Sequence, residues 1–256
     1  MKYRLIICTL LLLSWNWSCA RRPLPVEKPE AISTSELFSR LKARAAAWEV
    51  YQAKLQIRGE SPKGKFRFQS VILSQLPDKL RLEAYTTWGQ TAGVLITNNK
   101  DSRLYIPSEK VIYTTRHAED LVRYFLGMPI PMELFGYCLI ASVPPDQLSA
   151  WQIHRDVSGW RAAASTFHPA LQFTWQILAN PPALQAVTVK GEGSEYTILY
   201  DPAVYIDSDS TPKKINFSSS QWHMEVSVSQ MQTVRSLQSG VFSQPFPEGI
   251  RIVNLD

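Results

Sequence analysis

From Ser33 onward, the hydrophobic pattern begins with a helical period and then changes to a period of two. Ser33 and Glu36 have the spacing of a capping box, and apolar residues then recur every fourth position from Leu37. Across residues 51–57, apolar residues alternate strictly with polar ones. The pattern therefore predicts an amphipathic helix followed directly by a strand with one apolar face.

Short alternating runs continue along the rest of the chain. Phe66 and Phe68 alternate with basic and amide residues, as do Leu80 and Leu82 after a Pro-Asp turn. Further strand-like runs occupy residues 93–97, 102–106, 110–114, 151–155, 160–165, 172–178, 183–189, 195–199, 213–218 and 224–228. The runs predict roughly a dozen strands.

Two segments of helical spacing interrupt these runs. Residues 118–126 carry one apolar face and end before Gly127, a natural C-terminal stop. Residues 132–141 follow Pro131 and are apolar nearly all round, so we expect them to be covered on several sides or to face a cavity. We predict one α+β domain, residues 33–256. Its sheet should be antiparallel, because the connections between strands are too short for parallel crossovers.

The N-terminus has the pattern of a bacterial secretory signal. Lys2 and Arg4 precede an apolar run, Leu5 to Leu13, that would be about 14 Å long as a helix. A hydrocarbon core is about 30 Å thick, so this run is too short to span it. We expect residues 1–18 to be a signal peptide that is removed. Cys19 follows directly and resembles the lipidation site of bacterial lipoproteins; a plain signal cleaved nearby is the alternative.

Residues 19–32 form the expected link between this anchor and the domain. Pro23, Pro25 and Pro29 favour an extended spacer. If Cys19 carries acyl chains, this segment holds the domain away from the lipid surface.

Composition and charge exclude several classes of protein. With 45% hydrophobic residues, the chain can bury a sizeable core, which excludes disorder for most of its length. The net charge of +5 falls to +3 when Lys2 and Arg4 leave with the signal peptide (5 − 2 = 3), which is too small to indicate nucleic-acid binding.

The residues that usually carry chemistry form no recognisable constellation. The four histidines, at positions 117, 154, 168 and 223, are too far apart for a local metal site, and we expect no metal, no cofactor and no enzymatic activity. Cys8 lies in the signal and Cys19 at its end, so Cys138 is the one cysteine left and no internal disulfide is expected. Its apolar surroundings favour a buried thiol over a nucleophile.

Several segments resemble the LolB family of outer-membrane lipoprotein receptors, within the wider LolA/LolB superfamily. They are Arg81-Leu82-Glu83-Ala84-Tyr85 with the turn Thr87-Trp88-Gly89, then Ala118-Glu119-Asp120-Leu121, Leu126-Gly127-Met128-Pro129-Ile130-Pro131 and the C-terminal run Phe242 to Ile250. The resemblance implies an unclosed antiparallel β-barrel of about eleven strands, with an N-terminal helix and a helical lid over an apolar cavity.

The resemblance also implies a function. The protein would be lipid-anchored at the outer membrane with its domain facing the periplasm, and we expect a monomer. It would bind the acyl chains of lipoproteins delivered by a LolA-like periplasmic carrier and insert them into outer-membrane lipid. The alternative is a lipid-sensing or structural lipoprotein of the same fold without a delivery role.

Acyl chains cost about 0.8 kcal/mol per methylene to expose to water, so a lipid carrier needs a dry groove. A packed core is the alternative for any one of the side chains that could line it. The candidates are Tyr51, Leu55, Phe66, Phe68, Leu80, Leu82, Val94, Ile96, Leu126, Met128, Ile130, Met132 and Leu134.

Trp88 lies in a turn between two strands, where an exposed large apolar side chain has no folding role. The family resemblance places it at the protruding position associated with membrane transfer. The alternative is that its ring folds back onto the rim of the barrel.

Overall fold

The computed structural model describes residues 33–98, 101–144, 152–155, 159–168, 171–179, 181–191, 194–206, 209–243 and 249–256. The chain divides into two units, Met1–Ala31 and Ile32–Asp256, and all described helices and strands belong to the second. The expected signal peptide, the Cys19 anchor and the linker of residues 19–32 lie outside the described residues. None of the described helices is long and apolar enough to cross a membrane.

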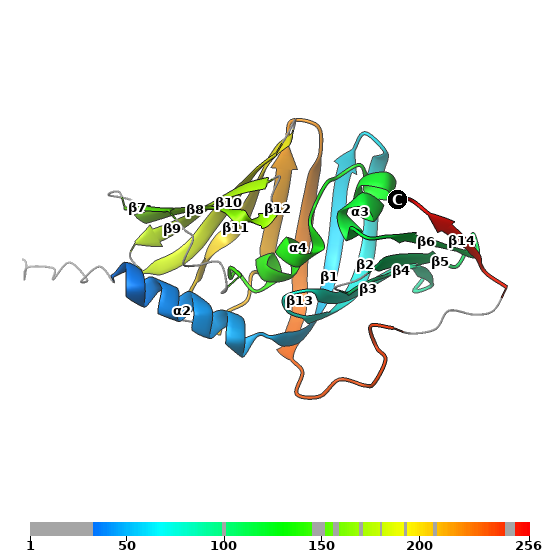
Figure 1. Ribbon diagram of the computed structural model, residues 1–256, viewed down its shortest axis with the longest axis horizontal. Coiled ribbons are helices and arrows are strands. Elements are labelled where there is room, and N and C mark those ends of the chain that lie inside the picture. Colours follow the sequence, from blue (N-terminus) through cyan, green and yellow to red (C-terminus); the bar gives the residue numbers. More distant parts are fainter. Residues whose placement is uncertain are drawn as a thin grey trace, which may run out of the picture. The chain divides into compact units, whose positions relative to one another are not determined.

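The second unit is built on one large sheet (Figure 1). In the described ranges the sheet has fourteen strands, more than the expected eleven or so. They are β1 Val50–Ser61, β2 Gly64–Gln75, β3 Lys79–Tyr85, β4 Thr91–Thr97, β5 Ser102–Ile106, β6 Val111–Thr115, β7 Gln152–Arg155, β8 Gly159–His168, β9 Leu171–Ala179, β10 Pro182–Gly191, β11 Ser194–Tyr205, β12 Lys214–Ser219, β13 His223–Thr233 and β14 Arg251–Asn254. Their order is β14-β6-β5-β4-β3-β2-β1-β13-β12-β11-β10-β9-β8-β7, so the sheet is unclosed, with β14 and β7 at its edges.

One strand corrects the expectation that the whole sheet is antiparallel. β14 pairs in parallel with β6, with Arg251 opposite Val111. The prediction rested on short connections between successive strands, but β6 and β14 are not successive, because β7 to β13 lie between them in the chain.

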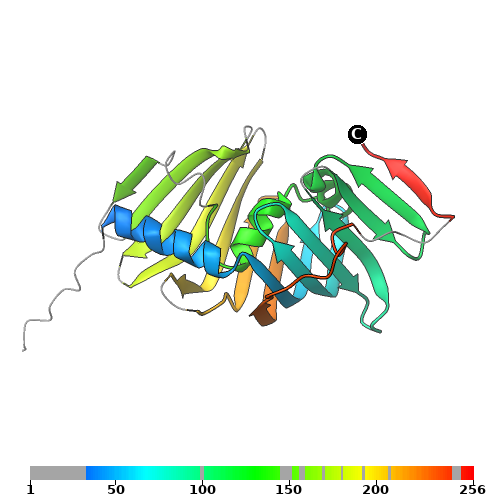
Figure 2. The same ribbon diagram turned by 60° about the horizontal axis from the view of Figure 1, so that its bottom comes forward.

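The three helices of the described residues lie on the concave face of the curved sheet (Figures 1 and 2). Helix α2, Thr34–Ala47, begins as its sequence predicts: the Ser33 hydroxyl oxygen accepts a hydrogen bond from the Glu36 amide at 3.2 Å. Helix α3 spans Ala118–Leu126, and α4 spans Met132–Leu139, slightly shorter than expected.

Helix α4 is buried on nearly all sides, and hydrogen bonds attach it to strands β1 and β11. The Tyr51 hydroxyl of β1 donates to the Gly136 carbonyl at 2.7 Å, and the Tyr200 hydroxyl of β11 donates to the Cys138 carbonyl at 3.2 Å. Just beyond the helix, the Ser142 hydroxyl donates to the Leu41 carbonyl of α2 at 3.2 Å. These bonds hold α4 in one position on the concave face, between β1 and β11.

Strands β8 to β12, together with α2, form what we call the packed half. Its concave side is filled by large side chains, among them Trp160, Trp175 and Phe217, each at most 1% exposed. They belong to one buried cluster with Leu37 and Leu41 of α2. Ile32–Asp256 therefore has a continuous core of its own, as expected of a domain that folds independently.

A buried cation joins α2 to this half. The Arg44 guanidinium donates from Nε to the Ile140 carbonyl at 2.6 Å and from Nη2 to the Ser210 carbonyl at 2.7 Å. Burial lowers the pKa of Arg44, although Tyr200 and Asp209 oppose that effect. Carbonyl oxygens thus compensate the loss of water around the charge.

Candidate functional site

An apolar cavity lies beneath α3, in the part of the sheet formed by β1 to β6, which we call the cavity half. Its volume is about 220 Å³, and all the residues that line it are apolar or glycine. They are Ile57, Phe68, Leu82, Ala84, Ala92, Gly93, Leu95, Leu104, Ile106, Leu121, Val122, Phe125, Leu126, Met128, Ile130, Met132, Phe135 and Met224. The lining offers a ligand dispersion contacts and exclusion from water, but no side-chain hydrogen bond.

The hollow arises where β3 and β4 carry small residues. Ala84 lies opposite Gly93 in the β3–β4 pairing, and Ala92 adjoins Gly93. One step further along the same face, Leu82 lies opposite Leu95 and supplies full-sized apolar walls. The space beneath α3 is therefore bounded by large side chains and left open by the small ones.

Helix α3 covers the cavity with one face and exposes the other. Leu121 and Phe125 line the cavity, whereas Tyr124 is 52% exposed. The helix ends at Gly127, whose φ of 69° is in the left-handed region. A Cβ at Gly127 would lie 3.2 Å from Lys63 Cγ, so this helix end packs against the β1–β2 turn.

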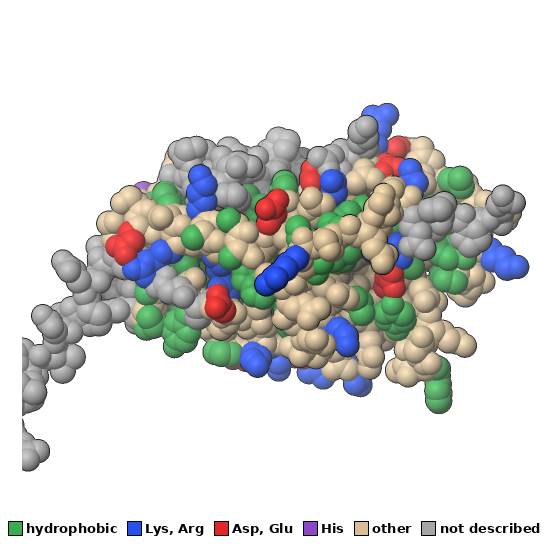
Figure 3. All heavy atoms as spheres, turned by 90° about the horizontal axis from the view of Figure 1, so that it is seen from below, with side chains coloured by type: hydrophobic (Ala, Val, Ile, Leu, Met, Phe, Trp, Pro, Cys, Tyr) green, Lys and Arg blue, Asp and Glu red, His purple; other side chains and the backbone are tan. Residues whose placement is uncertain are grey.

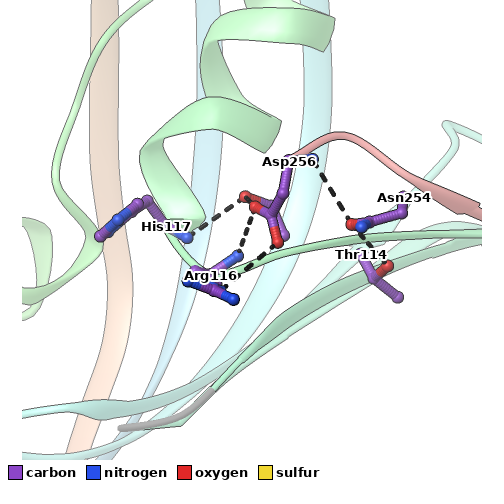
Figure 4. Close-up of polar contacts among 6 residues, drawn as sticks. Thr114, Arg116, His117, Asn254 and Asp256 are labelled. Atoms are coloured by element: carbon purple, nitrogen blue, oxygen red, sulfur yellow. Dashed lines mark hydrogen bonds and ion pairs between the residues drawn. The ribbon is translucent and has the colours of Figure 1, made fainter.

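The start of α3 is tied to the C-terminal strand (Figure 4). Asp256 Oδ1 accepts hydrogen bonds from the Thr115 hydroxyl at 2.8 Å and from the Arg116 amide at 3.0 Å, and Arg116 Nε lies 3.9 Å from Oδ2. The backbone bond from Arg116, the bond from Thr115 and the charges of Arg116 and His117 lower the pKa of Asp256. One carboxylate thus connects β14, β6 and α3.

The structure brings six of the expected lining residues together around this cavity. Four come from α3, the start of α4 and the segment between them, and two come from the sheet. They are Phe68, Leu82, Leu126, Met128, Ile130 and Met132. The sequence therefore located the α3–α4 segment and the strands β2 and β3 as parts of the cavity wall.

Five other candidates lie elsewhere. Tyr51, Leu55, Leu80 and Leu134 are buried in the core that surrounds α4 and do not line the cavity. Phe66 is partly buried beside Phe68, with ring centroids 6.3 Å apart.

The last two candidates, Val94 and Ile96, must be corrected. The β3–β4 register places Leu95 opposite Leu82 on the cavity side, so Val94 and Ile96 point to the other face of the sheet. The stretch 93–97 contains consecutive apolar residues, which gave no alternation from which to choose a face. Only the pairing with Leu82 could have identified Leu95 as a lining residue.

Trp88 is 89% exposed, the highest value among the exposed large hydrophobic residues of the described chain. Its turn is closed by hydrogen bonds from the Thr86 amide to the Gln90 carbonyl at 2.8 Å and from the Gly89 amide to the Thr86 carbonyl at 3.0 Å. Gly89 has a φ of 77°, which a glycine adopts without strain. The indole therefore projects from an ordered turn. Hydrophobic side chains also reach the surface on the face seen from below, among Lys and Arg (Figure 3).

Burial governs the chemistry of the free thiol on α4. Cys138 is buried, and burial raises the pKa of its thiol to about 12, which keeps it protonated at neutral pH. Within the described ranges, no group of three or more His, Cys, Asp or Glu residues is placed to hold a metal ion.

Several solved structures have a fold similar to that of this chain. A LolA superfamily protein from Nitrosomonas europaea matches with a TM-score of 0.50 and 11% identity, over 84% of this chain and 99% of that one. A putative outer membrane lipoprotein-sorting protein domain from Vibrio parahaemolyticus matches with a TM-score of 0.52 and 11% identity, over 82% and 97%. The chain shares the fold of these two structures.

A third structure with this fold is a DUF1329 family protein from Desulfovibrio piger, with a TM-score of 0.55 and 6% identity over 82% of this chain and 96% of that one. No protein-family model and no curated protein matches the sequence. The unclosed sheet and its helical cover agree with the fold expected from the sequence.

Proposed function

We propose that this protein is a lipid-anchored, LolB-like acceptor that binds the acyl chains of lipoproteins and inserts them into the outer membrane. The observation that carries the proposal is the cavity beneath α3, lined throughout by apolar residues and glycine. A dry lining suits an acyl chain, which needs shelter from water and no polar contact.

The cavity is too small for whole acyl chains, so it must widen to admit them. An apolar cavity of about 150 Å³ accepts benzene, so about 220 Å³ holds one short acyl segment. Two or three full acyl chains need more room. We propose that α3 moves away from the sheet to admit them, because it covers the cavity with a single helix face and exposes Tyr124 on the other.

The remaining parts of the proposal concern location and transfer. Cys19 would carry the acyl anchor at the outer membrane, with the domain in the periplasm and a LolA-like carrier as the donor of cargo. Trp88 would contact outer-membrane lipid, because an indole is favoured at the interface between lipid and water. The function proposed is that of a monomer and requires no cofactor and no chemical step.

The first experiment tests acyl binding. Ile32–Asp256 is titrated with a fluorescent fatty-acyl probe, alongside Leu82→Glu and, as a matched control, Ile252→Glu. We expect Leu82→Glu to abolish uptake, because it places a charge against the apolar wall. Ile252 is 67% exposed on β14, so its substitution should leave uptake unchanged. Normal uptake by a folded Leu82→Glu protein would contradict the proposal.

The second experiment separates delivery from binding. Trp88→Glu should retain probe affinity and lose transfer of bound lipoprotein to liposomes, while Tyr205→Glu, at an exposed aromatic residue of the packed half, retains both. If the parent protein binds acyl chains but transfers no lipoprotein, the lipid-sensing or structural alternative holds instead.

A further inference from the structure

We propose that the β1–β2 turn and the C-terminal end of α3, together with the Trp88 turn, form a docking surface for anionic phospholipid headgroups next to the cavity wall. The inference rests on the proposed function and deepens it by naming the lipid class that the domain recognises.

The strand pairing brings these segments to one end of the sheet. Ser61 pairs with Gly64 at the β1–β2 turn, and Gln69 pairs with Tyr85, the last residue of β3. The β1–β2 turn and the Trp88 turn therefore lie at the same end of the β2–β3 ladder, and β2 extends past β3 toward its own turn.

The end of α3 joins them there. Gly127 packs against the β1–β2 turn, and Lys63 Nζ lies 5.9 Å from the centre of the Tyr124 ring. Tyr124 also forms edge contacts with Phe125, at a centroid distance of 4.9 Å, and Phe125 lines the cavity. Lys63 thus contacts the exposed Tyr124 ring, which in turn contacts Phe125 in the cavity wall.

The charges at this end favour an anionic surface. The segment 60–67 holds Lys63, Lys65 and Arg67 against Glu60, and both lysines are exposed. Glu60 lies 3.8 Å from Lys65 Nζ with both side chains more than half exposed, a pair that water screens strongly. Exposed Trp and Tyr beside Lys is the composition of a membrane interface, where the rings enter the headgroup layer and the cations meet phosphate.

This arrangement places the docking surface on the helix that covers the cavity. Tyr124 and Phe125 are neighbours on α3, one exposed and one in the cavity wall. A headgroup layer that takes up the Tyr124 ring acts directly on the helix that covers the cavity.

The test measures co-sedimentation of Ile32–Asp256 with vesicles of phosphatidylcholine alone and of phosphatidylcholine with phosphatidylglycerol in equal amounts. We expect clear preference for the anionic vesicles, weakened by salt. Each Lys near an anionic surface contributes roughly fivefold in partitioning, so Lys63→Glu/Lys65→Glu should reduce it by roughly tenfold or more. Tyr124→Ala should weaken binding with its salt dependence unchanged.

The control is Lys42→Glu/Lys54→Glu, which changes net charge equally at exposed positions on α2 and in β1 away from its turn. It should bind anionic vesicles nearly as the parent does. Equal losses in both double variants would overturn the proposal, since net charge alone would then explain binding. Equal binding of the parent to both kinds of vesicle would also overturn the proposal. The basic surface around Lys63 and Lys65 would then be assigned to an acidic protein partner.

Acyl-probe uptake, measured on the same samples, distinguishes this inference from the proposed function. The Lys63→Glu/Lys65→Glu protein should take up the probe as the parent does. Failure of vesicle preference with normal uptake would remove the docking surface alone, whereas failure of the parent to take up the probe would remove the proposed function.

Discussion

The two halves of the sheet differ in the size of the side chains on their concave face. In the packed half, Trp160 and Trp175 fill the concave face against α2 and are almost completely buried. In the cavity half, Ala84 and Gly93 occupy the corresponding face of β3 and β4, and a space of about 220 Å³ remains beneath α3. The difference shows that a curved sheet needs only a few small residues at one position to change a core into a binding site.

Helix α4 separates the two regions and belongs to both. Its carbonyls accept hydrogen bonds from Tyr51 on one side and Tyr200 on the other. By contrast, α3 meets the cavity half through apolar contacts and is tied at its start by Asp256. We expect the packed half and α4 to be the stable frame against which α3 moves.

The largest expected effect tests how unequal the halves are in packing. Trp175 is 1% exposed and stacks on Phe173 at a centroid distance of 5.7 Å, so Trp175→Ala should cost about 3–5 kcal/mol of unfolding free energy. Phe68→Ala should cost roughly half of that or less, because Phe68 already borders a void. Urea denaturation of both variants measures this. Equal costs would mean that the cavity half is packed as tightly as the other.

The hydrogen bonds to α4 should have a smaller and similar effect in both halves. Tyr51→Phe and Tyr200→Phe each remove one buried donor to a helix carbonyl, which should cost about 1–2 kcal/mol. Tyr205→Phe, at a side chain 51% exposed, is the control and should stay within about 0.5 kcal/mol. A large loss for only one of the buried tyrosines would show that α4 belongs to one half rather than to both.

The smallest effect concerns the pH dependence of β14. The pKa of Asp256 is below its ordinary value of 3.8 in the folded chain, first through the Arg116 backbone hydrogen bond. Its contribution to stability is therefore full above that ordinary value and is lost as the pH falls through the lower folded-state pKa. Amide exchange of Leu255, whose N–H donates to the Thr114 carbonyl, should accelerate there relative to its intrinsic rate.

The Asp256→Asn variant isolates this group, because the pKa values of Glu83 and Glu225 are also lowered in the folded chain. Exchange at Leu255 in the variant should no longer respond to pH in this window beyond its intrinsic change. An unchanged response would assign the effect to other carboxylates.

The sequence correctly predicted the elements that are determined by residues close together in the chain. The Ser33 cap and the recurring apolar residues from Leu37 fixed α2, and the turn composition around Trp88 predicted an exposed indole. Strand alternation identified Leu82 as a residue of the concave face. In each case the information lay within a few neighbouring residues.

Features that depend on pairing between strands far apart in the chain could not be predicted from the sequence. The inward side chain of β4 is Leu95, but its flanking residues are equally apolar, and only the register with β3 distinguishes them. The strand β14 is short and of mixed composition, and its parallel pairing with β6 depends on a return across the molecule. The cavity follows from Ala84 lying opposite Gly93, a relation that no local pattern contains.

The most direct test of the central claim fills the hollow. Ala84→Leu places apolar atoms in the cavity, and Ala162→Leu, at a fully buried residue opposite Trp175, makes the same change where no space exists. The measurement is titration of each variant with the fluorescent acyl probe. We predict that Ala84→Leu keeps or gains stability and loses affinity by roughly tenfold or more, equivalent to about 1.4 kcal/mol. Ala162→Leu should lose about 1–3 kcal/mol of stability through overpacking and keep its affinity. Parental affinity in a folded Ala84→Leu protein would contradict the account.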